Sequence, residues 1–476
     1  MHLIKQIEEI KVLVHQEQSS LKENIFRAYD IRGIYPEDFD EKAAFAIGIA
    51  LAYKADNDKR FVVAMDGRLS SNAIKNSLIS GLLSGGVDVI DCGMLPTPLL
   101  YFATYYLGIS NGLMITGSHN PKNYNGIKMI IDGDPLFDKD IYALRDWIIN
   151  NQEKIKKNHC GKLSYDESIL ENYINRVIND LDIKTSKKFI VDSMNGVTGN
   201  VVKKIFHSFN IDADYINQEV NGNFPNCSPD PTKETNLESL KKHVKDANAD
   251  YGVAFDGDGD RTVIIKNDGS VLWPDELMII FAKSILKEVN QAKIVFDVKC
   301  TMNLRKSILE SNGIPIECRT GHSYIKNMIK QERAMLGGEM SGHIFFNDKW
   351  YGFDDGIYVF LRFLEILTND DELTSVVDEM PRTYASPELD INFNGNGHFE
   401  FMSKFMKTAS FDDYTVSNTD GIKILNQTSW GLIRPSNTSP KITLRFESSS
   451  ENGLKIIKND IKNAILKIDN TLDLPF

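Results

Sequence analysis

The 476-residue sequence contains only five cysteines and no long uncharged apolar run. The cysteines are scattered and form no Cys-x-x-Cys pair, so we expect no disulfide framework, and a reducing compartment suits them. The most apolar stretches, such as residues 45–53, are much shorter than the roughly 20 residues that a bilayer span needs. No secretion signal is apparent at the N-terminus. We therefore expect a cytoplasmic protein that does not contact a membrane.

Positive charge is also in deficit, because 54 basic side chains stand against 66 acidic ones and give a net charge of −12. This charge argues against a nucleic-acid-binding protein, since nucleic acids are bound through positive surfaces. The hydrophobic fraction of 42% excludes a disordered chain. At roughly 150 residues per domain, the length predicts three or four domains, each large enough for a core of its own.

Three segments share a pattern that is typical of buried parallel strands: a basic residue, a short apolar run and an acidic residue. They occupy residues 60–66, 188–192 and 293–297. A helix-compatible stretch follows each segment, and further on comes a second strand that ends in an unusual loop. These second strands and their loops occupy residues 111–121, 250–261 and 334–343. The repetition predicts three related α/β domains.

The C-terminal part has a different pattern. Apolar and polar residues alternate near Asp390 and Lys441, which predicts antiparallel strands with one face toward solvent. Residues 454–472 have the pattern of a terminal helix. We therefore predict a fourth, smaller α+β domain.

Before the first domain, Ile4, Ile7, Ile10 and Val14 recur at helical spacing. They predict an amphipathic helix that packs on the body of the protein or on a second subunit. The predicted boundaries are residues 1–22 for this extension, and residues 23–163, 164–268, 269–381 and 382–476 for the four domains.

The strongest chemical signal is the sequence FDGDGDR at residues 255–261. Asp256, Asp258 and Asp260 alternate with glycines, so three carboxylates can converge from one tight turn. Oxygen ligands of this kind suit Mg²⁺ or Ca²⁺ rather than zinc. An EF-hand does not fit, because its sixth position would be Arg261 rather than glycine and its twelfth is not a glutamate. A solvated acidic turn is disfavoured, since three adjacent like charges are costly without a cation.

The loop TGSHNPKNYNGIKM, residues 116–129, places a candidate nucleophile at the end of a strand. Ser118 is surrounded by glycine, asparagine and proline, and Lys128 is close enough in a folded loop to exchange a proton with it. Taken alone, such a loop is also typical of structural capping. The G-x-S-x-G elbow is missing, which disfavours an acyl hydrolase.

Two more loops offer groups that bind sugars and phosphates. GGEMSGH at residues 337–343 carries Glu339, Ser341 and His343, and carboxylates accept hydrogen bonds from sugar hydroxyls. RPSNTSP at residues 434–440 contains a guanidinium group and several hydroxyls without an acid, which suits a phosphate monoester. Each loop alone can be an ordinary turn. Together the four loops supply a nucleophile, a metal site, a polyol clamp and an anion clamp.

Five motifs in one order allow a comparison with a known family. They are FRAYDIRG (26–33), TGSHNP (116–121), DGDGDR (256–261), GEMSGH (338–343) and RPSNTSP (434–440). From about Ile25 to its C-terminus, the chain resembles the bacterial phosphomannomutase/phosphoglucomutases of the α-D-phosphohexomutase superfamily. The resemblance implies three related α/β domains with mixed sheets and a smaller C-terminal α+β domain, arranged around a central active-site cleft.

The resemblance also implies roles for individual residues. Ser118 matches the serine that carries a phosphoryl group and that binds Mg²⁺ together with the aspartates matching Asp256, Asp258 and Asp260. Lys128 and His343 match candidate general acid/base positions, and hexose 1,6-bisphosphate (glucose or mannose) is the implied activator. Glu339 and Ser341 match the residues that hold the sugar hydroxyls. The loop that binds the phosphate not being transferred is matched by Arg434, Ser436, Asn437 and Thr438. Other positions lining the cleft are matched by Tyr29, Arg32, His119, Arg261, Lys299 and His322.

The expected function is therefore the Mg²⁺-dependent interconversion of hexose 6-phosphate and hexose 1-phosphate, with no nucleic acid or membrane partner, by a monomer or homodimer. Met340 favours mannose and glucose phosphates, because the phosphoglucosamine mutase branch usually has glutamine there. Phosphoglucosamine mutase is the near alternative. An aspartate-nucleophile sugar phosphatase would release phosphate without needing Ser118. A non-catalytic sugar-phosphate-binding protein would tolerate the loss of Ser118 or Asp258.

Overall fold

The computed structural model describes residues 21–55, 57–151, 161–395, 397–436 and 440–476. They form two compact units. Unit 1 consists of the described residues of Met1–Pro274 with Ser341–Asn369, and unit 2 consists of those of Asp275–Met340 with Asp370–Phe476. The predicted N-terminal amphipathic helix lies outside the described residues. Within the described ranges, none of the helices combines the length and apolar character needed to cross a bilayer.

The first sheet of unit 1 is mixed. Among the described residues its strand order is β1-β5-β4-β2-β3-β7, with β6 beside β5. β2 is parallel to β3 and β4, whereas β5 is antiparallel to β1 and β4. The strands are β1 (Ile31–Ile34), β2 (Arg60–Met65), β3 (Asp88–Met94), β4 (Gly112–Ile115), β5 (Tyr124–Ile131), β6 (Asp134–Pro135) and β7 (Leu163–Tyr165).

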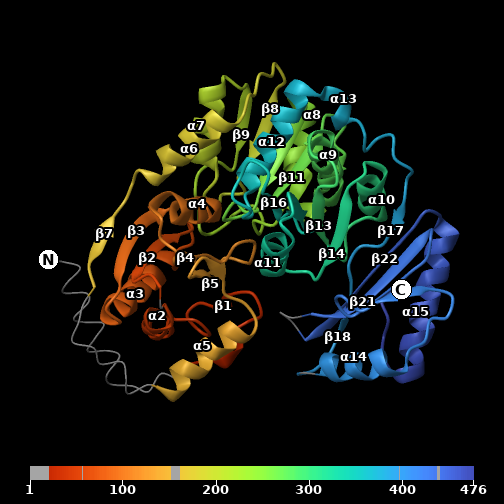
Figure 1. The fold of residues 1–476 in the computed structure, drawn as a ribbon, viewed down its shortest axis with the longest axis horizontal. Helices are drawn as coiled ribbons and strands as arrows, with labels where there is room; N and C mark the ends of the chain where they lie inside the picture. The colour runs from red at the N-terminus through yellow and green to blue at the C-terminus, as the bar shows by residue number, and fades with distance from the viewer. Residues whose placement is uncertain (1–20, 56, 152–160, 396, 437–439) are drawn as a thin grey trace. The chain divides into compact units, whose positions relative to one another are not determined.

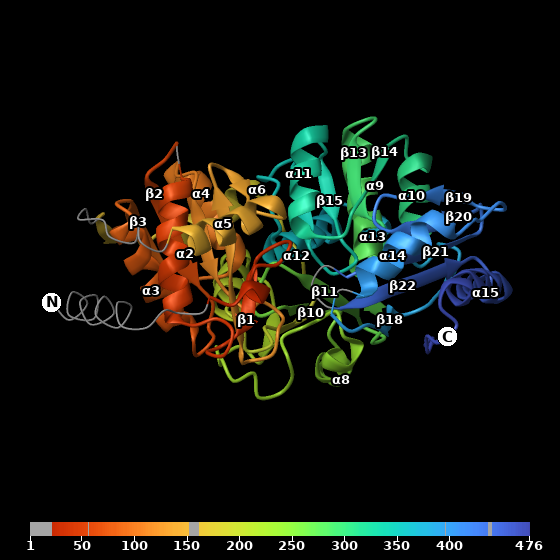
Figure 2. The same cartoon turned by 90° about the horizontal axis from the view of Figure 1, so that it is seen from below.

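Two helices of this first sheet, α2 (Glu41–Lys54) and α3 (Ser71–Ser84), lie side by side (Figures 1 and 2). Glycines allow their backbones to approach, because a Cβ at Gly48 would be 2.3 Å from the carbonyl oxygen of Leu78. Their apolar side chains contribute to the core that also contains Phe61 and Val63 of β2. The other helices before β7 are η1 (Glu23–Ile25), α4 (Thr97–Leu107) and α5 (Lys139–Asn150).

The second sheet of unit 1 has the order β12-β11-β10-β8-β9 in the described part of the chain. β8 is parallel to β9 and β10, and β10 and β11 form an antiparallel hairpin. Phe360 packs edge-on against Phe189 and Phe255 and so attaches α12 to this sheet. The strands of this sheet are β8 (Phe189–Asp192), β9 (Ala213–Ile216), β10 (Tyr251–Phe255), β11 (Thr262–Lys266) and β12 (Val271–Leu272). The other elements of unit 1 are α6 (Ile169–Asp180), α7 (Gly199–Phe209), η3 (Glu234–Leu237), α8 (Glu238–Asp246), β16 (Ile344–Phe346) and α12 (Gly356–Asn369).

Unit 2 begins with a third parallel arrangement, in which β13 pairs with both β14 and β15. Its last part is an antiparallel sheet of order β17-β22-β21-β20-β19, with β18 beside β22. α14 and α15 pack on that sheet (Figure 1). The elements are α9 (Pro274–Glu288), β13 (Lys293–Asp297), α10 (Met302–Glu310), β14 (Ile314–Cys318), α11 (His322–Glu332), β15 (Leu336–Gly338), α13 (Asp371–Thr374), β17 (Tyr384–Ala385), β18 (Leu389–Asn392), α14 (Gly397–Thr408), β19 (Thr415–Ser417), β20 (Ile422–Leu425), β21 (Ser429–Pro435), β22 (Lys441–Ser448) and α15 (Glu451–Ile468).

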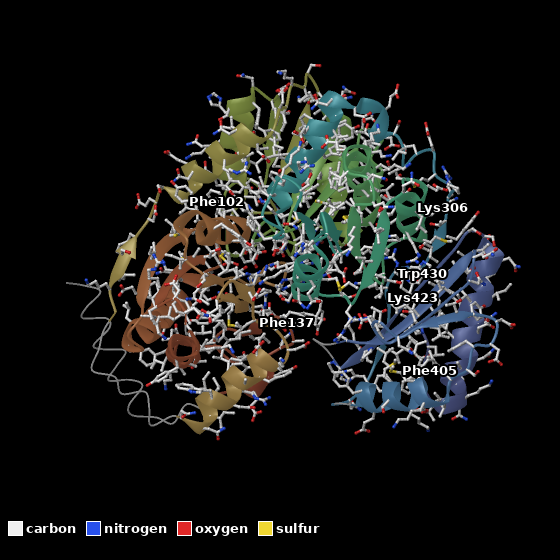
Figure 3. All side chains as sticks on the ribbon, in the orientation of Figure 1. Phe102, Phe137, Lys306, Phe405, Lys423 and Trp430 are labelled. Carbon is white, nitrogen blue, oxygen red and sulfur yellow. The ribbon has the colours of Figure 1, made fainter. Side chains whose placement is uncertain are left out.

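The two parts of unit 2 are joined through Lys423 and Trp430, which lie next to each other in Figure 3. The Lys423 ammonium lies 4.5 Å from the centre of the Trp430 ring and donates to the carbonyl of Val298 at 2.7 Å. It also forms an ion pair with Glu317 at the end of β14. Because Trp430 packs against Val298 as well, apolar burial and a charge-assisted hydrogen bond attach the antiparallel sheet to the segment after β13.

The structure confirms the predicted fold class. Each of the three repeated segments forms the central strand of a parallel trio, in the orders β3-β2-β4, β9-β8-β10 and β14-β13-β15. The predicted terminal helix begins earlier than expected, because Ser450 caps it by accepting a hydrogen bond from the Gly453 amide at 3.0 Å. The domain boundaries and the central cleft stay predictions.

Candidate active site

Ser118 occupies a strained position in the loop after β4, three residues beyond its last residue. Its φ of 45° lies in the left-handed region, which residues with a side chain rarely adopt. Its amide donates to the Thr116 hydroxyl at 2.7 Å, and the side chain is only 2% exposed. β5 then returns antiparallel to β4, so Lys128 pairs with Met114 and comes back beside the loop. Strand pairing therefore places the predicted nucleophile and the predicted lysine together.

The aspartate loop joins β10 to β11 and forms the predicted carboxylate cluster. Asp256, Asp258 and Asp260 are each 0% exposed, and one oxygen from each lies within 4.8 Å of the others. Asp256 shapes the turn by accepting hydrogen bonds from the amides of Gly259 (3.0 Å) and Arg261 (3.2 Å). The cluster is therefore held by its own turn.

Ser118 and Lys128 contact this cluster directly. The Ser118 hydroxyl donates to Asp256 Oδ2 at 2.8 Å. Lys128 Nζ donates to Asp258 Oδ2 at 2.8 Å and also pairs with Asp260. A Cβ on Gly257 would be 2.6 Å from the Ser118 carbonyl oxygen, so glycine is needed where the two loops meet.

The electrostatics of the cluster are dominated by burial and by like charge. Burial, together with Asp258 and Asp260, raises the pKa of Asp256 well above its usual value. Burial alone would raise the pKa of Asp258, but Lys128 outweighs it and lowers that pKa. Burial would lower the pKa of Lys128, yet Asp258 and Asp260 outweigh this effect and raise that pKa. The Lys128 amine therefore stays protonated and positively charged.

A divalent cation fits this donor set. Lys128 brings one positive charge to three buried carboxylates, and within the described residues Asp258 Oδ1 and Asp260 Oδ1 have no hydrogen-bond partner. Buried oxygens without partners cost free energy that a cation would recover. The all-oxygen composition favours Mg²⁺ or Ca²⁺ over a softer metal.

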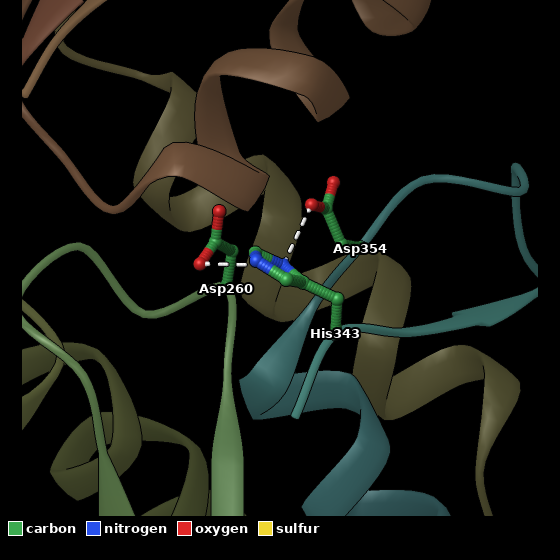
Figure 4. A group of neighbouring side chains, drawn as sticks. All are labelled: Asp260, His343 and Asp354. Carbon is green, nitrogen blue, oxygen red and sulfur yellow. Dashed lines mark ion pairs between the residues drawn. The ribbon is translucent and has the colours of Figure 1, made fainter. Parts of the chain in front are cut away.

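His343 lies between two carboxylates beside the cluster, as Figure 4 shows. Its Nδ1 is 3.0 Å from Asp354 Oδ2 and 3.6 Å from Asp260 Oδ1. Arg261 Nε donates to His343 Nε2 at 3.0 Å. Because Nε2 accepts a hydrogen bond, the ring's proton resides on Nδ1 and faces Asp354. The predicted His343 and Arg261 are thus neighbours, although they come from the residues directly before β16 and β11.

Arg32, His119 and Tyr29 belong to the same unit. Arg32 on β1 donates to Asn120 Oδ1 at 3.1 Å, so it contacts the serine loop. His119 Nδ1 lies 3.2 Å from the Ser118 hydroxyl oxygen. Burial first, and then the charges of Arg261 and Arg32, hold the pKa of His119 well below its usual value, so this imidazole is neutral. Tyr29 is half-buried just before β1.

The remaining predicted residues divide between the units. Ser341 lies in unit 1, half-buried, two residues before His343. Glu339 lies in unit 2, where its Oε1 accepts a hydrogen bond from the Gly321 amide at 2.5 Å, directly before His322. Within unit 2, the structure therefore brings the predicted Glu339 and His322 loops together.

The predicted anion-binding side chains of unit 2 are already paired with carboxylates. Arg434 Nε donates to Asp420 Oδ2 at 2.8 Å. Lys299 Nζ donates to Glu388 Oε1 at 2.5 Å. Lys299 lowers the pKa of Glu388 against the effect of burial, and Arg434 contributes to the same shift. The two cations therefore act on a common carboxylate.

The rest of the predicted phosphate loop is described in part. The Ser436 amide donates to the Lys441 carbonyl at 2.8 Å, which closes the loop end. Asn437 and Thr438 lie outside the described residues.

Four residues that contact this site were not predicted from the sequence. Thr97 donates to Asp258 Oδ2 at 2.6 Å, Asp354 faces His343, and Asp66 and Arg68 hold the serine loop. The sequence Asp-Gly-Arg after the first repeated strand was an available signal for Asp66 and Arg68. Thr97 follows a proline at a helix start and carried no distinguishing signal.

Comparison with known proteins explains this arrangement. Four domain models of phosphoglucomutase/phosphomannomutase match in order: α/β/α domain I at residues 23–155, domain II at 171–269, domain III at 273–384 and the C-terminal domain at 400–464. The chain belongs to the phosphoglucomutase/phosphomannomutase family. It is thus an enzyme of a family of isomerases that act as intramolecular phosphotransferases.

Full-length relatives support membership in the phosphoglucomutase/phosphomannomutase family. A phosphomannomutase/phosphoglucomutase of Pseudomonas putida is 38% identical over 98% of this chain and 100% of its own. A phosphoglucomutase of Neisseria gonorrhoeae is 37% identical over 94% of this chain and 98% of its own. The crystal structure of a phosphoglucomutase/phosphomannomutase family protein from Burkholderia thailandensis has a TM-score of 0.89 and 36% identity, covering 96% of this chain and 100% of that one.

Proposed function

We propose that this enzyme interconverts hexose 6-phosphates and hexose 1-phosphates of mannose, glucose or both, and that Ser118 carries the transferred phosphoryl group. One observation carries the proposal: the Ser118 hydroxyl lies 2.8 Å from Asp256 Oδ2, in a buried three-carboxylate cluster that also contacts Lys128. A hydroxyl held in this way is suited to accept and donate a phosphoryl group.

The metal ligands in this proposal are the phosphorylated Ser118 with Asp256, Asp258 and Asp260. Mg²⁺ bound there would offset the negative charge of the phosphoryl oxygens during transfer. The support is the fit of the buried oxygens described above. Lys128, held as an ammonium, adds a fixed positive charge beside the same oxygens.

In the first half-reaction the bond between Ser118 Oγ and phosphorus breaks, and a bond forms from phosphorus to the free hydroxyl of the sugar. We assign removal of that hydroxyl's proton to His343, whose Nε2 would accept the proton once the sugar hydroxyl replaces Arg261 Nε as its hydrogen-bond donor, while Nδ1 stays beside Asp354. Lys128 is the weaker candidate, since the aspartates hold it charged. The product is a hexose 1,6-bisphosphate, whose other phosphoryl group returns to Ser118 in the second half-reaction.

We assign recognition of the sugar hydroxyls to Glu339 and Ser341, and recognition of the phosphate that is not transferred to the loop of Arg434, Ser436, Asn437 and Thr438 with Lys299. The support for an anion site is that Arg434 and Lys299 both act on Glu388 and so bring two cationic donors to one part of unit 2. Tyr29, Arg32, His119, Arg261 and His322 complete the proposed contacts. The scattered cysteines, of which Cys92, Cys227, Cys300 and Cys318 are free, support a cytoplasmic enzyme.

The test is a coupled assay with mannose 1-phosphate, glucose 1-phosphate and glucosamine 1-phosphate, each with trace hexose 1,6-bisphosphate. We expect turnover of mannose and glucose phosphates, and we expect Ser118→Ala to lose nearly all of it. Preferred turnover of glucosamine 1-phosphate would instead favour phosphoglucosamine mutase. Release of inorganic phosphate by a Ser118→Ala variant would favour an aspartate-nucleophile phosphatase. Undiminished mutase turnover in the Ser118→Ala variant would refute the proposal that Ser118 carries the transferred phosphoryl group.

A further inference from the structure

Arg68 is a buried residue whose side chain is entirely engaged in holding the serine loop. It is 3% exposed and follows β2 in the sequence Asp66-Gly67-Arg68. A guanidinium group has five N–H donors. Here Nη1 donates to the carbonyls of Pro121 (2.6 Å) and Tyr124 (3.0 Å), and Nη2 donates to those of Ser118 and Asn120 (both 2.7 Å). Nε donates to Asp66 Oδ2 at 3.1 Å.

Asp66 holds the start of the same loop. Its Oδ2 accepts hydrogen bonds from the Thr116 hydroxyl at 2.9 Å and the Gly117 amide at 3.1 Å. Its Oδ1 accepts from the Arg68 amide and the Ser71 hydroxyl, at 3.0 and 2.5 Å. The Asp66–Arg68 pair therefore contacts the backbone on both sides of the nucleophile.

The conformation that the pair holds is a strained one. Ser118 has a φ of 45°, and a non-glycine residue in a sparsely populated region costs about 1–3 kcal/mol, so surrounding contacts must maintain it. A Cβ on Gly117 would be 2.3 Å from Arg68 Nε, so the backbone packs directly on the guanidinium. The Phe224 ring also lies 5.0 Å from Arg68 Cζ. The geometry thus leaves neither Arg68 nor the loop free to relax.

We propose that Arg68, fixed by Asp66, is a positioning residue for phosphoryl transfer at Ser118. It acts through the backbone carbonyls and keeps the Ser118 hydroxyl aimed at Asp256. Lysine cannot replace it, because a single ammonium cannot reach four separate carbonyls in a fixed fork. The inference rests on the proposed function, since it concerns the serine that carries the phosphoryl group.

The experiment follows transfer of label from hexose 1,6-bisphosphate to Ser118 by rapid quench and peptide mass analysis in the full-length enzyme. We expect Arg68→Lys to slow this transfer at least 100-fold, because misplacing a reacting group by about 1 Å costs about that factor. We expect the KM for the hexose phosphate to change less than about threefold, since Arg68 is fully engaged with the loop. If Arg68 had only a structural role, the variant would lose thermal stability but would not combine a slow phosphoryl transfer with an almost unchanged KM.

Arg362→Lys is the matched control. Arg362 is 4% exposed and forms a two-point ion pair with Asp348. Neither residue belongs to the proposed site. We expect this variant to lose thermal stability while it labels Ser118 at the wild-type rate.

Gly117→Ala is the second variant, for use if Arg68→Lys does not fold. Its new Cβ would displace the guanidinium with Arg68 still present, so we expect the same slow transfer. Wild-type labelling rates in a folded Arg68→Lys or Gly117→Ala variant would overturn the inference. Failure of the wild-type enzyme to label Ser118 at all would instead overturn the proposed function.

Discussion

Replacing Lys128 by methionine should strengthen the binding of Mg²⁺ while it lowers catalytic turnover. Lys128 Nζ lies 2.8 Å from Asp258 Oδ2 and also contacts Asp260, so the ammonium competes for the oxygens assigned to the metal. With an effective dielectric constant of about 20, the attraction at that distance is about 6 kcal/mol. Even a quarter of this energy, about 1.5 kcal/mol, corresponds to slightly more than a tenfold change in Kd.

The assay is isothermal titration of Mg²⁺ into the metal-free enzyme, compared with turnover in saturating Mg²⁺. We expect the Kd of Lys128→Met to be at least about tenfold lower than that of the wild-type enzyme. We expect its turnover to fall, because the fixed positive charge near the phosphoryl oxygens is lost. Metal binding thus becomes stronger while turnover becomes slower. General damage to the fold would instead weaken both.

Lys75→Met is the control for the loss of a buried ion pair. Lys75 Nζ lies 2.6 Å from Asp91 Oδ2, and both residues are buried. Breaking a buried pair by removing one partner costs about 3–5 kcal/mol of unfolding free energy, so both variants should be less stable. The Kd for Mg²⁺ should change only in Lys128→Met. An unchanged or higher Kd in that variant would refute the assignment of these oxygens to the metal.

Three further predictions concern other parts of the protein. Asp354→Asn should lower kcat about 100-fold with little change in KM, because the carboxylate that orients His343 is lost; steady-state kinetics with an unchanged kcat would contradict this. Glu388→Gln should lower the KM for glucose 1-phosphate about threefold or more, because Glu388 occupies Lys299 and repels a phosphate; a higher KM would be incompatible with that competition. Burial raises the pKa of Asp355 to about 7, so the fold favours its protonated form, and this contribution to stability is present below about pH 4 and lost as the pH rises through 7. The loss is about 4 kcal/mol at most, and Asp355→Asn should remove this pH dependence in urea unfolding between pH 4 and 8.

Much of the fold followed from local patterns. The three repeated strands were found because short apolar runs between turns are buried on both faces, and each lies at the centre of a parallel trio. The carboxylate cluster was found because alternating aspartates and glycines can bring three carboxylates together within one turn. Both signals lie within about ten consecutive residues, so no knowledge of distant contacts was needed.

The division of roles between Lys128 and His343 was not available from their positions in the chain. Lys128 is held charged by aspartates 130 and 132 residues away, and His343 lies beside Asp354 and accepts a hydrogen bond from Arg261 of the aspartate loop. Electrostatic shifts depend on distance and burial in space, and spacing along a chain reports neither.

The sequence by itself thus determined which chemical groups the enzyme has and which strands and turns present them, because periodicity and turn composition act over neighbouring residues. Only the tertiary structure decided which groups touch. The contacts of Arg68 with carbonyls 50 and 53 residues further along arise from the parallel pairing of β2 with β4. Such pairing is a property of the packed sheet, and packing depends on the whole unit rather than on any one segment.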